Sequence, residues 1–223
     1  MNLSNSRLGV HLRSQRDRPF LEEVERYYTR RVLEYGATPL GVDWSCQATQ
    51  ELRFAQLLNL VNFAAPYALN DLGCGYGALV AYVMKYHSRC NVDYLGIDIS
   101  PAMISAARKL WGRRRGVKFA IGSACPRVAD YSVASGIFNV KLGRSTREWE
   151  GAIAKTLINL HSCSRLGFAV NFLAPRDCGQ MRRIELYRTP PEPWCRFCEE
   201  NFDASVDLLG AYGLREFTLL VRY

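Results

Sequence analysis

The sequence has 223 residues, enough for one domain with a full core and somewhat more than the average domain has. Hydrophobic residues make up 48% and charged residues 22%, and no segment approaches the ~18 consecutive apolar residues of a membrane span, so no membrane partner is expected. The net charge of +8 favours anionic partners such as nucleic acid, phosphates or carboxylates, although basic clusters this short also occur on solvated surfaces.

The amino-terminal region is polar and basic and lacks the apolar segment of a secretory signal. We therefore expect a cytoplasmic protein whose eight cysteines are free thiols rather than a disulfide framework. Residues 1–18 are expected to form a flexible arm, and apolar spacing predicts a helix over 20–35. A second helix should begin at a cap on Ser45 or Thr49 and run to about Ala64.

From residue 66 onward the pattern changes to short apolar strands that alternate with helices. The strands are expected over 67–72, 92–97, 117–121, 131–135, 166–172, 206–210 and 216–221, and the helices over 78–86, 101–111, 146–160 and 194–201. Such alternation predicts a mostly parallel sheet covered by helices on both faces. Only residues 211–215 separate the last two strands, too few for a crossover helix, so these strands should pair as an antiparallel hairpin.

These elements predict an α/β fold with a mostly parallel seven-stranded sheet, a C-terminal antiparallel hairpin and an N-terminal helical cap. The arm and cap occupy 1–64 and the Rossmann-like sheet domain 65–223, within one structural unit. The connection over 173–193 is long, and loops of this kind often form lids or substrate walls. Its arginines favour an anionic small-molecule substrate; they are Arg176, Arg182 and Arg183.

A glycine-rich loop, Asp71-Leu72-Gly73-Cys74-Gly75-Tyr76-Gly77, joins the first of these strands to the next helix. Glycines there permit a tight turn and let the backbone approach a ligand closely. Gly73, Gly75 and Ala78 also satisfy the dinucleotide fingerprint. The carboxylate of Asp71, two positions before the first glycine, favours an ammonium group over a diphosphate, which it would repel.

Asp98 ends the second predicted strand. A carboxylate at this place can accept hydrogen bonds from both hydroxyls of a ribose. The alternative role is to cap the next helix, but Ser100 supplies a cap there and Pro101 suits the first turn. We therefore predict that Asp98 binds a ribose.

Several segments resemble one known family. Residues 71–83, DLGCGYGALVAYV, and 94–109, YLGIDISPAMISAARK, are similar to motifs I and II of class I S-adenosylmethionine-dependent methyltransferases. ASGIFN at 134–139 lies where motif IV would fall, and residues 27–58 resemble the helical cap of small bacterial methyltransferase-like proteins. The resemblance runs from about Tyr27 to the C-terminus and implies S-adenosyl-L-methionine as the cofactor.

The resemblance also implies a role for each matching position. The residues implied for the methionine part are Gly73, Cys74, Gly75 and Gly77, that for the ribose is Asp98, and those for the adenine are Ile99 and Met103. The family usually has an acidic residue after the third strand that accepts from the adenine amino group. Here Ser123 and Ala124 follow that strand, so adenine would be held by a weaker hydroxyl contact or by backbone amides.

Methyl transfer asks the protein mainly for positioning, because the sulfonium is already activated. The residues from Ser135 to Asn139 follow the fourth strand, should lie beside the sulfonium, and include no carboxylate or histidine. Asn139 can both donate and accept hydrogen bonds, and its alternative role is a turn or helix cap. Phe138, Tyr27 or Tyr28 could stabilise a sulfonium by cation–π attraction, or could pack in the core.

Two further features carry charged or metal-binding side chains. Arg53 could present its planar guanidinium to the methionine carboxylate, or could form a surface salt bridge with Glu51 or Asp43. The only cysteine pair at metal-ligand spacing is Cys195 and Cys198. A structural zinc site needs four ligands, so we predict no metal.

The sequence predicts an enzyme that uses S-adenosylmethionine to methylate a small molecule. One alternative is cyclisation of the cofactor's methionine part to azetidine-2-carboxylic acid and methylthioadenosine, as in some proteins that resemble this group. A second is an RNA methyltransferase, which the charge favours; the lack of an Asn-Pro-Pro-Tyr type motif and of a separate RNA-binding domain makes nucleic acid an unlikely substrate. More distant alternatives are a nonenzymatic cofactor-binding module and a nicotinamide oxidoreductase, and no pattern indicates an oligomeric state.

Overall fold

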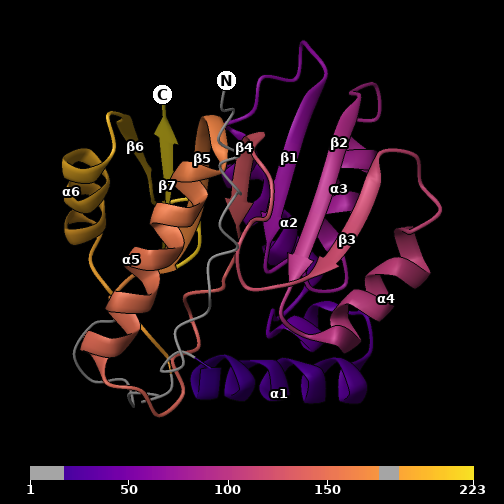
Figure 1. The fold of residues 1–223 in the computed structure, drawn as a ribbon, viewed down its shortest axis with the longest axis horizontal. Helices are drawn as coiled ribbons and strands as arrows, with labels where there is room; N and C mark the ends of the chain where they lie inside the picture. Colours follow the sequence, from indigo (N-terminus) through magenta and orange to yellow (C-terminus); the bar gives the residue numbers. More distant parts are fainter. Residues whose placement is uncertain (1–17, 176–185) are drawn as a thin grey trace, which may run out of the picture.

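A computed structural model describes residues 18–175 and 186–223 of the chain. Its centre is a seven-stranded sheet in the order β3-β2-β1-β4-β5-β7-β6 (Figure 1). The strands are β1 Tyr67–Leu72, β2 Val92–Asp98, β3 Val117–Ile121, β4 Ala129–Ala134, β5 Ser164–Leu173, β6 Ser205–Leu209 and β7 Glu216–Arg222. Strands β1 to β5 pair in parallel, whereas β7 pairs antiparallel with both β5 and β6. The predicted α/β fold and its C-terminal hairpin are therefore confirmed.

The helices cover both faces and one edge of this sheet. They are α1 Arg18–Tyr35, α2 Gln47–Leu58, α3 Ala78–Tyr86, α4 Pro101–Trp111, α5 Thr146–Ser162 and α6 Glu192–Asn201, with a short 3-10 helix, η1 Pro39–Val42. Buried residues of α2, α3 and α4 pack in one cluster, and those of α5 and α6 in another. Figure 1 shows α1 lying across the end of the sheet to which the arrowheads of β2 and β3 point.

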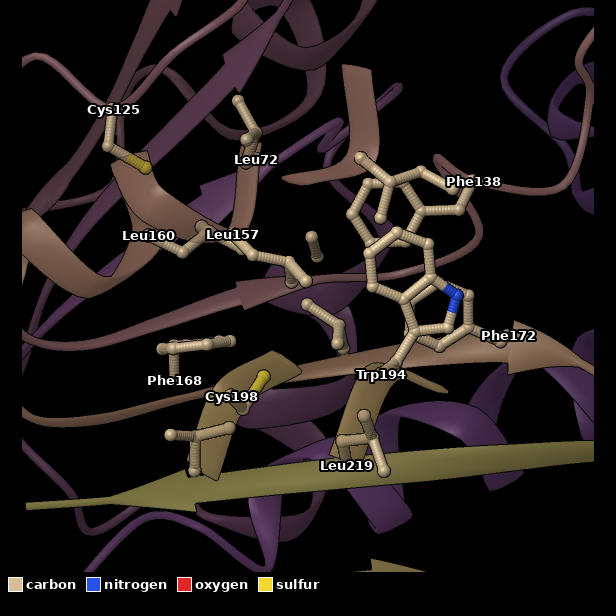
Figure 2. Packing of buried hydrophobic residues seen from close by; sticks show 14 of the residues in the cluster. Leu72, Cys125, Phe138, Leu157, Leu160, Phe168, Phe172, Trp194, Cys198 and Leu219 are labelled. Carbon is tan, nitrogen blue, oxygen red and sulfur yellow. The ribbon is translucent and has the colours of Figure 1, made fainter. Parts of the chain in front are cut away.

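Alternation along each strand explains the two layers of core. Successive side chains of a strand point to opposite faces, so neighbours in sequence join different clusters. In β7, Leu219 packs with α5 and α6 while Leu220 packs with α2 and α3. The first cluster is rich in aromatic rings, and Phe138, Phe172 and Trp194 lie together in it (Figure 2).

The second helix departs from the sequence prediction at both ends. It ends at Leu58 rather than near Ala64, because Leu60 and Val61 turn inward and are only 2% and 8% exposed. Neither Ser45 nor Thr49 caps it: the N-cap is Cys46, without a side-chain cap bond, and the two hydroxyls lie 3.2 Å apart. The other predicted elements match the structure to within two residues at each end.

Some predictions fall on residues that are not described. Of the arm over 1–18 only the last residue is described, as the first of α1, and Arg176, Arg182 and Arg183 lie outside the described ranges. Within those ranges, no helix has the length and apolar character that crossing a bilayer requires. The division between cap and sheet domain near residue 65 stays a prediction.

Candidate functional site

A cavity of about 170 Å³ lies at the carboxyl ends of β1, β2, β3 and β4. The loops that follow these strands form its floor, and α1 covers it. Residues from α2 and α5 close its sides. The carboxyl edge of a parallel sheet is where ligands bind in open α/β folds, so this cavity is the candidate site.

The glycine loop holds its turn by backbone conformations that other residues rarely adopt. Gly73, Gly75 and Gly77 have φ angles of +76°, +54° and +80°. A Cβ atom on Gly73 would lie 2.1 Å from a methyl group of Ile137, so the loops after β1 and β4 are in tight contact. Gly73, Cys74 and Gly75 line the cavity, whereas Gly77 caps α3 and packs against Trp111.

Asp98 lines the cavity at the end of β2 and is 8% exposed. Its carboxylate accepts hydrogen bonds from the backbone N–H groups of Gly75, at 2.9 Å, and Ser100, at 2.8 Å. Burial raises the pKa of Asp98 to about 6, although these N–H donors act in the opposite direction. Ser100 caps α4 through its hydroxyl, which accepts from the N–H of Met103, so the cap role does not fall to Asp98.

Asp71 is a second buried carboxylate at the cavity, 3% exposed. The hydroxyl of Tyr94 donates to it at 2.6 Å. Burial raises the pKa of Asp71 to about 7, and the nearby charge of Asp98 adds to this effect. The two carboxylates therefore favour a ligand that brings a positive charge and hydrogen-bond donors.

The loops after β2 and β3 form the next part of the wall. Ile99, Met103 and Ser123 line the cavity, as the sequence prediction expects for an adenine site, and Gly122 lines it beside them. Ala124 does not line the cavity and is exposed to solvent. Ser123 is therefore the polar side chain of this loop that a ligand would meet.

The loop after β4 contributes buried polar atoms that have no hydrogen-bond partner among the described residues. Ser135 and Phe138 line the cavity; Asn139 does not, although it is only 7% exposed. The Ser135 hydroxyl and the Asn139 carbonyl oxygen Oδ1 are buried without a hydrogen-bond partner among the described residues. Phe138 stacks on Phe172 with ring centroids 5.0 Å apart (Figure 2), so most of its ring belongs to the core.

Helix α1 closes the side of the cavity opposite the strand ends. Phe20, Leu21, Val24 and Tyr28 line it from one side of the helix. The Thr29 hydroxyl lies 2.7 Å from the hydroxyl of the α4 cap residue, which ties α1 to the loop after β2. Burial raises the pKa of Tyr28, so this phenol is a neutral wall residue.

Arg53 is placed differently from the sequence prediction. Its side chain does not line the cavity but forms a buried, two-pronged ion pair with Glu216 of β7. The alternative partners were also wrong: Asp43 pairs with Arg31 at 2.7 Å, and Glu51 with Lys85 at 3.2 Å. A partner 163 positions away in the chain is brought close only by the fold.

Comparisons with known proteins agree on a family. A family model described as a methyltransferase domain matches residues 70–149. A protein of Mycobacterium tuberculosis that carries a provisional methyltransferase name is 43% identical over 165 residues, which are 74% of this chain and 98% of that protein. The chain belongs to the class I S-adenosylmethionine-dependent methyltransferase family.

Solved structures of methyltransferases share the fold. The magnesium protoporphyrin IX methyltransferase of Synechocystis, solved with bound S-adenosylhomocysteine, has a TM-score of 0.61 at 16% identity, covering 91% of this chain and 99% of that one. A phosphoethanolamine N-methyltransferase of Haemonchus contortus, solved with phosphoethanolamine and S-adenosylhomocysteine, has a TM-score of 0.65 at 9% identity. It covers 91% of this chain and 48% of that one.

The methyltransferase cavity also has walls that the sequence motifs did not indicate. Trp44 precedes α2, and Gln50 lies on α2 and accepts a hydrogen bond from the hydroxyl of Tyr76 at 3.1 Å. Trp149 and Thr156 line the cavity from α5. Their helical spacing marks a buried helix face, but a sequence cannot distinguish a face against a core from a face against a cavity.

The thiol pair at metal-ligand spacing lies apart from the cavity. Cys195 and Cys198 are both free and both on α6. Over residues 18–175 and 186–223, no three histidine, cysteine or acidic side chains gather closely enough to hold a metal ion.

Proposed function

We propose that the cavity binds S-adenosyl-L-methionine and that the protein transfers its methyl group to a small apolar molecule. The observation that carries the proposal is the pair of buried carboxylates, Asp71 and Asp98, on either side of the glycine loop. In this assignment the methionine part lies along Gly73, Cys74 and Gly75, with its ammonium group on the Asp71 side. Two solved structures with this fold contain S-adenosylhomocysteine, which supports the choice of cofactor.

The nucleoside part has matching partners along the loops after β2 and β3. Asp98 holds the ribose hydroxyls, and its raised pKa means that a ligand with hydroxyl donors stabilises the charged form. Ile99 and Met103 supply apolar contacts for the adenine, and Ser123 a hydroxyl. All four residues assigned to the nucleoside therefore line the same cavity.

The acceptor part of the cavity is assigned to the side of β4. Strand order carries the cofactor across the ends of β3, β2 and β1, which leaves the loop after β4 for the acceptor. Phe20, Trp44 and Trp149 line the cavity there. Aromatic walls favour a flat, apolar molecule, because rings offer a large contact area and pack on one another's faces and edges.

The chain's own chemical contribution is positioning. S-adenosylmethionine supplies an activated methyl group, so the protein has to align the acceptor and keep water away. The buried hydroxyl of Ser135, which lines the cavity in the loop next to the assigned methyl position, can hydrogen-bond an acceptor hydroxyl or amine, whereas Asn139 lies behind this wall. The aromatic walls limit the access of water to that position.

A binding experiment tests the cofactor assignment. Calorimetry should give one site per chain for S-adenosylhomocysteine, and NAD should give no heat of binding because Asp71 would repel its diphosphate. Incubation with S-adenosylmethionine and a panel of small phenols and aromatic amines should then yield a methylated product. Tight binding of NAD with none of S-adenosylhomocysteine would overturn the proposal.

A further inference from the structure

A chain of buried hydrogen bonds connects the helical cap to the loop after β4. It begins at Arg53 of α2, whose guanidinium pairs with Glu216 of β7, with Nε 2.7 Å from Oε2. The same carboxylate oxygen accepts from the side-chain amide of Asn171 on β5, at 3.2 Å. Oδ1 of Asn171 then accepts from the backbone N–H of Gly136, at 2.7 Å. All three residues are at most 6% exposed.

Both ends of this chain of bonds reach the cavity. Gly136 lines the cavity and has a φ angle of +74°, a conformation that glycine adopts without steric cost, and its N–H is held by the bond to Asn171. Its neighbour Ile137 packs on Gly73, where a Cβ atom would lie only 2.1 Å from it. At the other end, the guanidinium of Arg53 lies 3.8 Å from the ring centre of Trp44, which also lines the cavity.

We propose that Asn171 and Glu216 are positioning residues for the cofactor and acceptor site. They act through Gly136 and Trp44 and touch neither the cofactor nor the acceptor. The inference rests on the proposed function, because it assumes that the cavity binds S-adenosylmethionine. Its new content is that β5, supported by Glu216 of the C-terminal hairpin and far from every glycine-loop motif, sets the position of the loop after β4.

The geometry favours a positioning role over simple stabilisation. Burying an ion pair costs much of what the two charges gain from each other, so a pair of apolar side chains could stabilise the fold as well. What apolar side chains could not supply is the directed bond from Asn171 to the N–H of Gly136. This bond fixes one peptide plane, and with it the direction in which Ser135 and Ile137 face the cavity.

The decisive comparison uses Asn171→Ala and Asn70→Ala in the full chain, with S-adenosylhomocysteine as the probe. Asn70 is a matched control, because it is a buried asparagine of the same sheet whose amide bonds the carbonyl of Arg127 at 3.1 Å, and it does not line the cavity. We expect Asn171→Ala to weaken binding about tenfold and to speed hydrogen exchange at the Gly136 amide. Asn70→Ala should change the dissociation constant less than about twofold at a similar loss of stability.

The affinities of Asn171→Ala and Asn70→Ala decide between a positioning role and simple stabilisation. Unchanged affinity in Asn171→Ala, or an equal loss in Asn70→Ala, would overturn the positioning role, and that comparison decides the proposal by itself. The double variant Arg53→Met with Glu216→Leu then measures the share of the ion pair, which should also weaken binding while the fold remains. If the wild-type protein does not bind S-adenosylhomocysteine at all, the proposed function fails instead, so the two failures are distinguishable.

Discussion

The carboxylates of Asp71 and Asp98 are costly to keep charged because both are buried. Burial is the main cause that raises their pKa values to about 7 and about 6. Carboxylates with shifted pKa values in a cavity are typical of functional sites, because a ligand can supply the positive charge and the hydrogen-bond donors that they lack. The same two side chains therefore give the most direct predictions.

Replacing Asp98 should weaken cofactor binding strongly. In Asp98→Ala the ribose loses a charged acceptor of two hydrogen bonds, a change on the order of 2–3 kcal/mol, or about 30- to 150-fold in the dissociation constant. Calorimetry with S-adenosylhomocysteine measures it, and circular dichroism checks that the variant is folded. Asp93→Asn, on the exposed side of the same strand, should bind like the wild type. Equal affinity of Asp98→Ala and wild type would leave Asp98 as a structural residue only.

Binding should also depend on pH. Ribose binding needs ionised Asp98, whose pKa burial raises to about 6, so affinity for S-adenosylhomocysteine should fall as pH drops below about 6. The limit is about tenfold per pH unit for one proton, and calorimetry in buffers of different ionisation enthalpy should detect proton release on binding. Asp98→Asn should reduce this dependence; an unchanged profile would contradict the assignment.

The raised pKa of Asp98 also affects stability. A rise in pH should lower the free energy of unfolding, although it strengthens ligand binding. The folded state keeps a proton on Asp98 between its ordinary pKa of 3.8 and the raised pKa of about 6, whereas the unfolded chain has already released it. The free energy of unfolding of the empty protein should therefore fall as pH rises through this window, measured by urea titration. Asp98→Asn should flatten this fall. A rise in wild-type stability with pH there would mean that other groups dominate.

Residue roles could be predicted where the local sequence determines them. The turn at Gly73 and Gly75 needs positive φ angles, which favour glycine, and Asp98 follows directly from its place at the end of a strand. Arg53 and Trp149 could not be predicted in the same way. Their partners lie on distant strands and helices, and only tertiary packing determines whether such side chains face the cavity, the core or each other.

At the scale of elements, the cap helix α1 should respond to the cofactor. It lines the cavity with Phe20, Val24 and Tyr28 and is tied to the loop after β2 by one hydroxyl contact of Thr29. A ligand beneath it adds contacts that are lost when the helix opens, so its amides should exchange more slowly with S-adenosylhomocysteine bound. Amides of α6, which contributes no residue to the cavity, serve as the control. Equal slowing in both helices would indicate global stabilisation only.

The elements themselves were largely predictable, and the reasons for the misses are physical. Short apolar runs between helical segments located the strands, such as Tyr67–Leu72, which matches residue for residue. The end of α2 was missed because Leu60 and Val61 look helical in sequence yet are buried by a turn. The direct connection of β3 to β4 by residues 122–128 was predicted, because the sequence has no helical pattern between those two strands.

On the scale of the whole molecule, the cavity extends beyond the residues of the cofactor motifs. Its walls extend from the loop after β3 to the contact between Phe20 of α1 and Trp149 of α5, whose ring centroids are 5.2 Å apart. The N–H of the Trp149 indole donates to the carbonyl of Phe138 at 2.9 Å, which holds this wall against the loop after β4. Walls on that side favour a second substrate, since the cofactor's assigned contacts all lie along β1, β2 and β3.

This shape bears on the choice between methyl transfer and cyclisation. Cyclisation needs no second substrate: the cofactor's α-amine attacks its own γ-carbon, and methylthioadenosine leaves with the C–S bonding electrons. For that, the amine must be neutral and the methionine part bent back. In this structure Asp71 lies beside the assigned ammonium position, and a carboxylate that ionises there favours the charged, non-nucleophilic amine. The geometry thus favours transfer to an external acceptor.

Product analysis tests this prediction. Purified protein with S-adenosylmethionine alone should form neither methylthioadenosine nor azetidine-2-carboxylate above the uncatalysed background. Adding an aromatic acceptor that the protein methylates should yield S-adenosylhomocysteine in step with methylated product. Asp71→Asn removes the charge that keeps the amine protonated, so any trace of cyclisation should increase in that variant while transfer declines. Methylthioadenosine and azetidine-2-carboxylate appearing together from the wild-type protein would instead establish cyclisation, and the aromatic wall of Phe20 and Trp149 would then serve to enclose the bent cofactor.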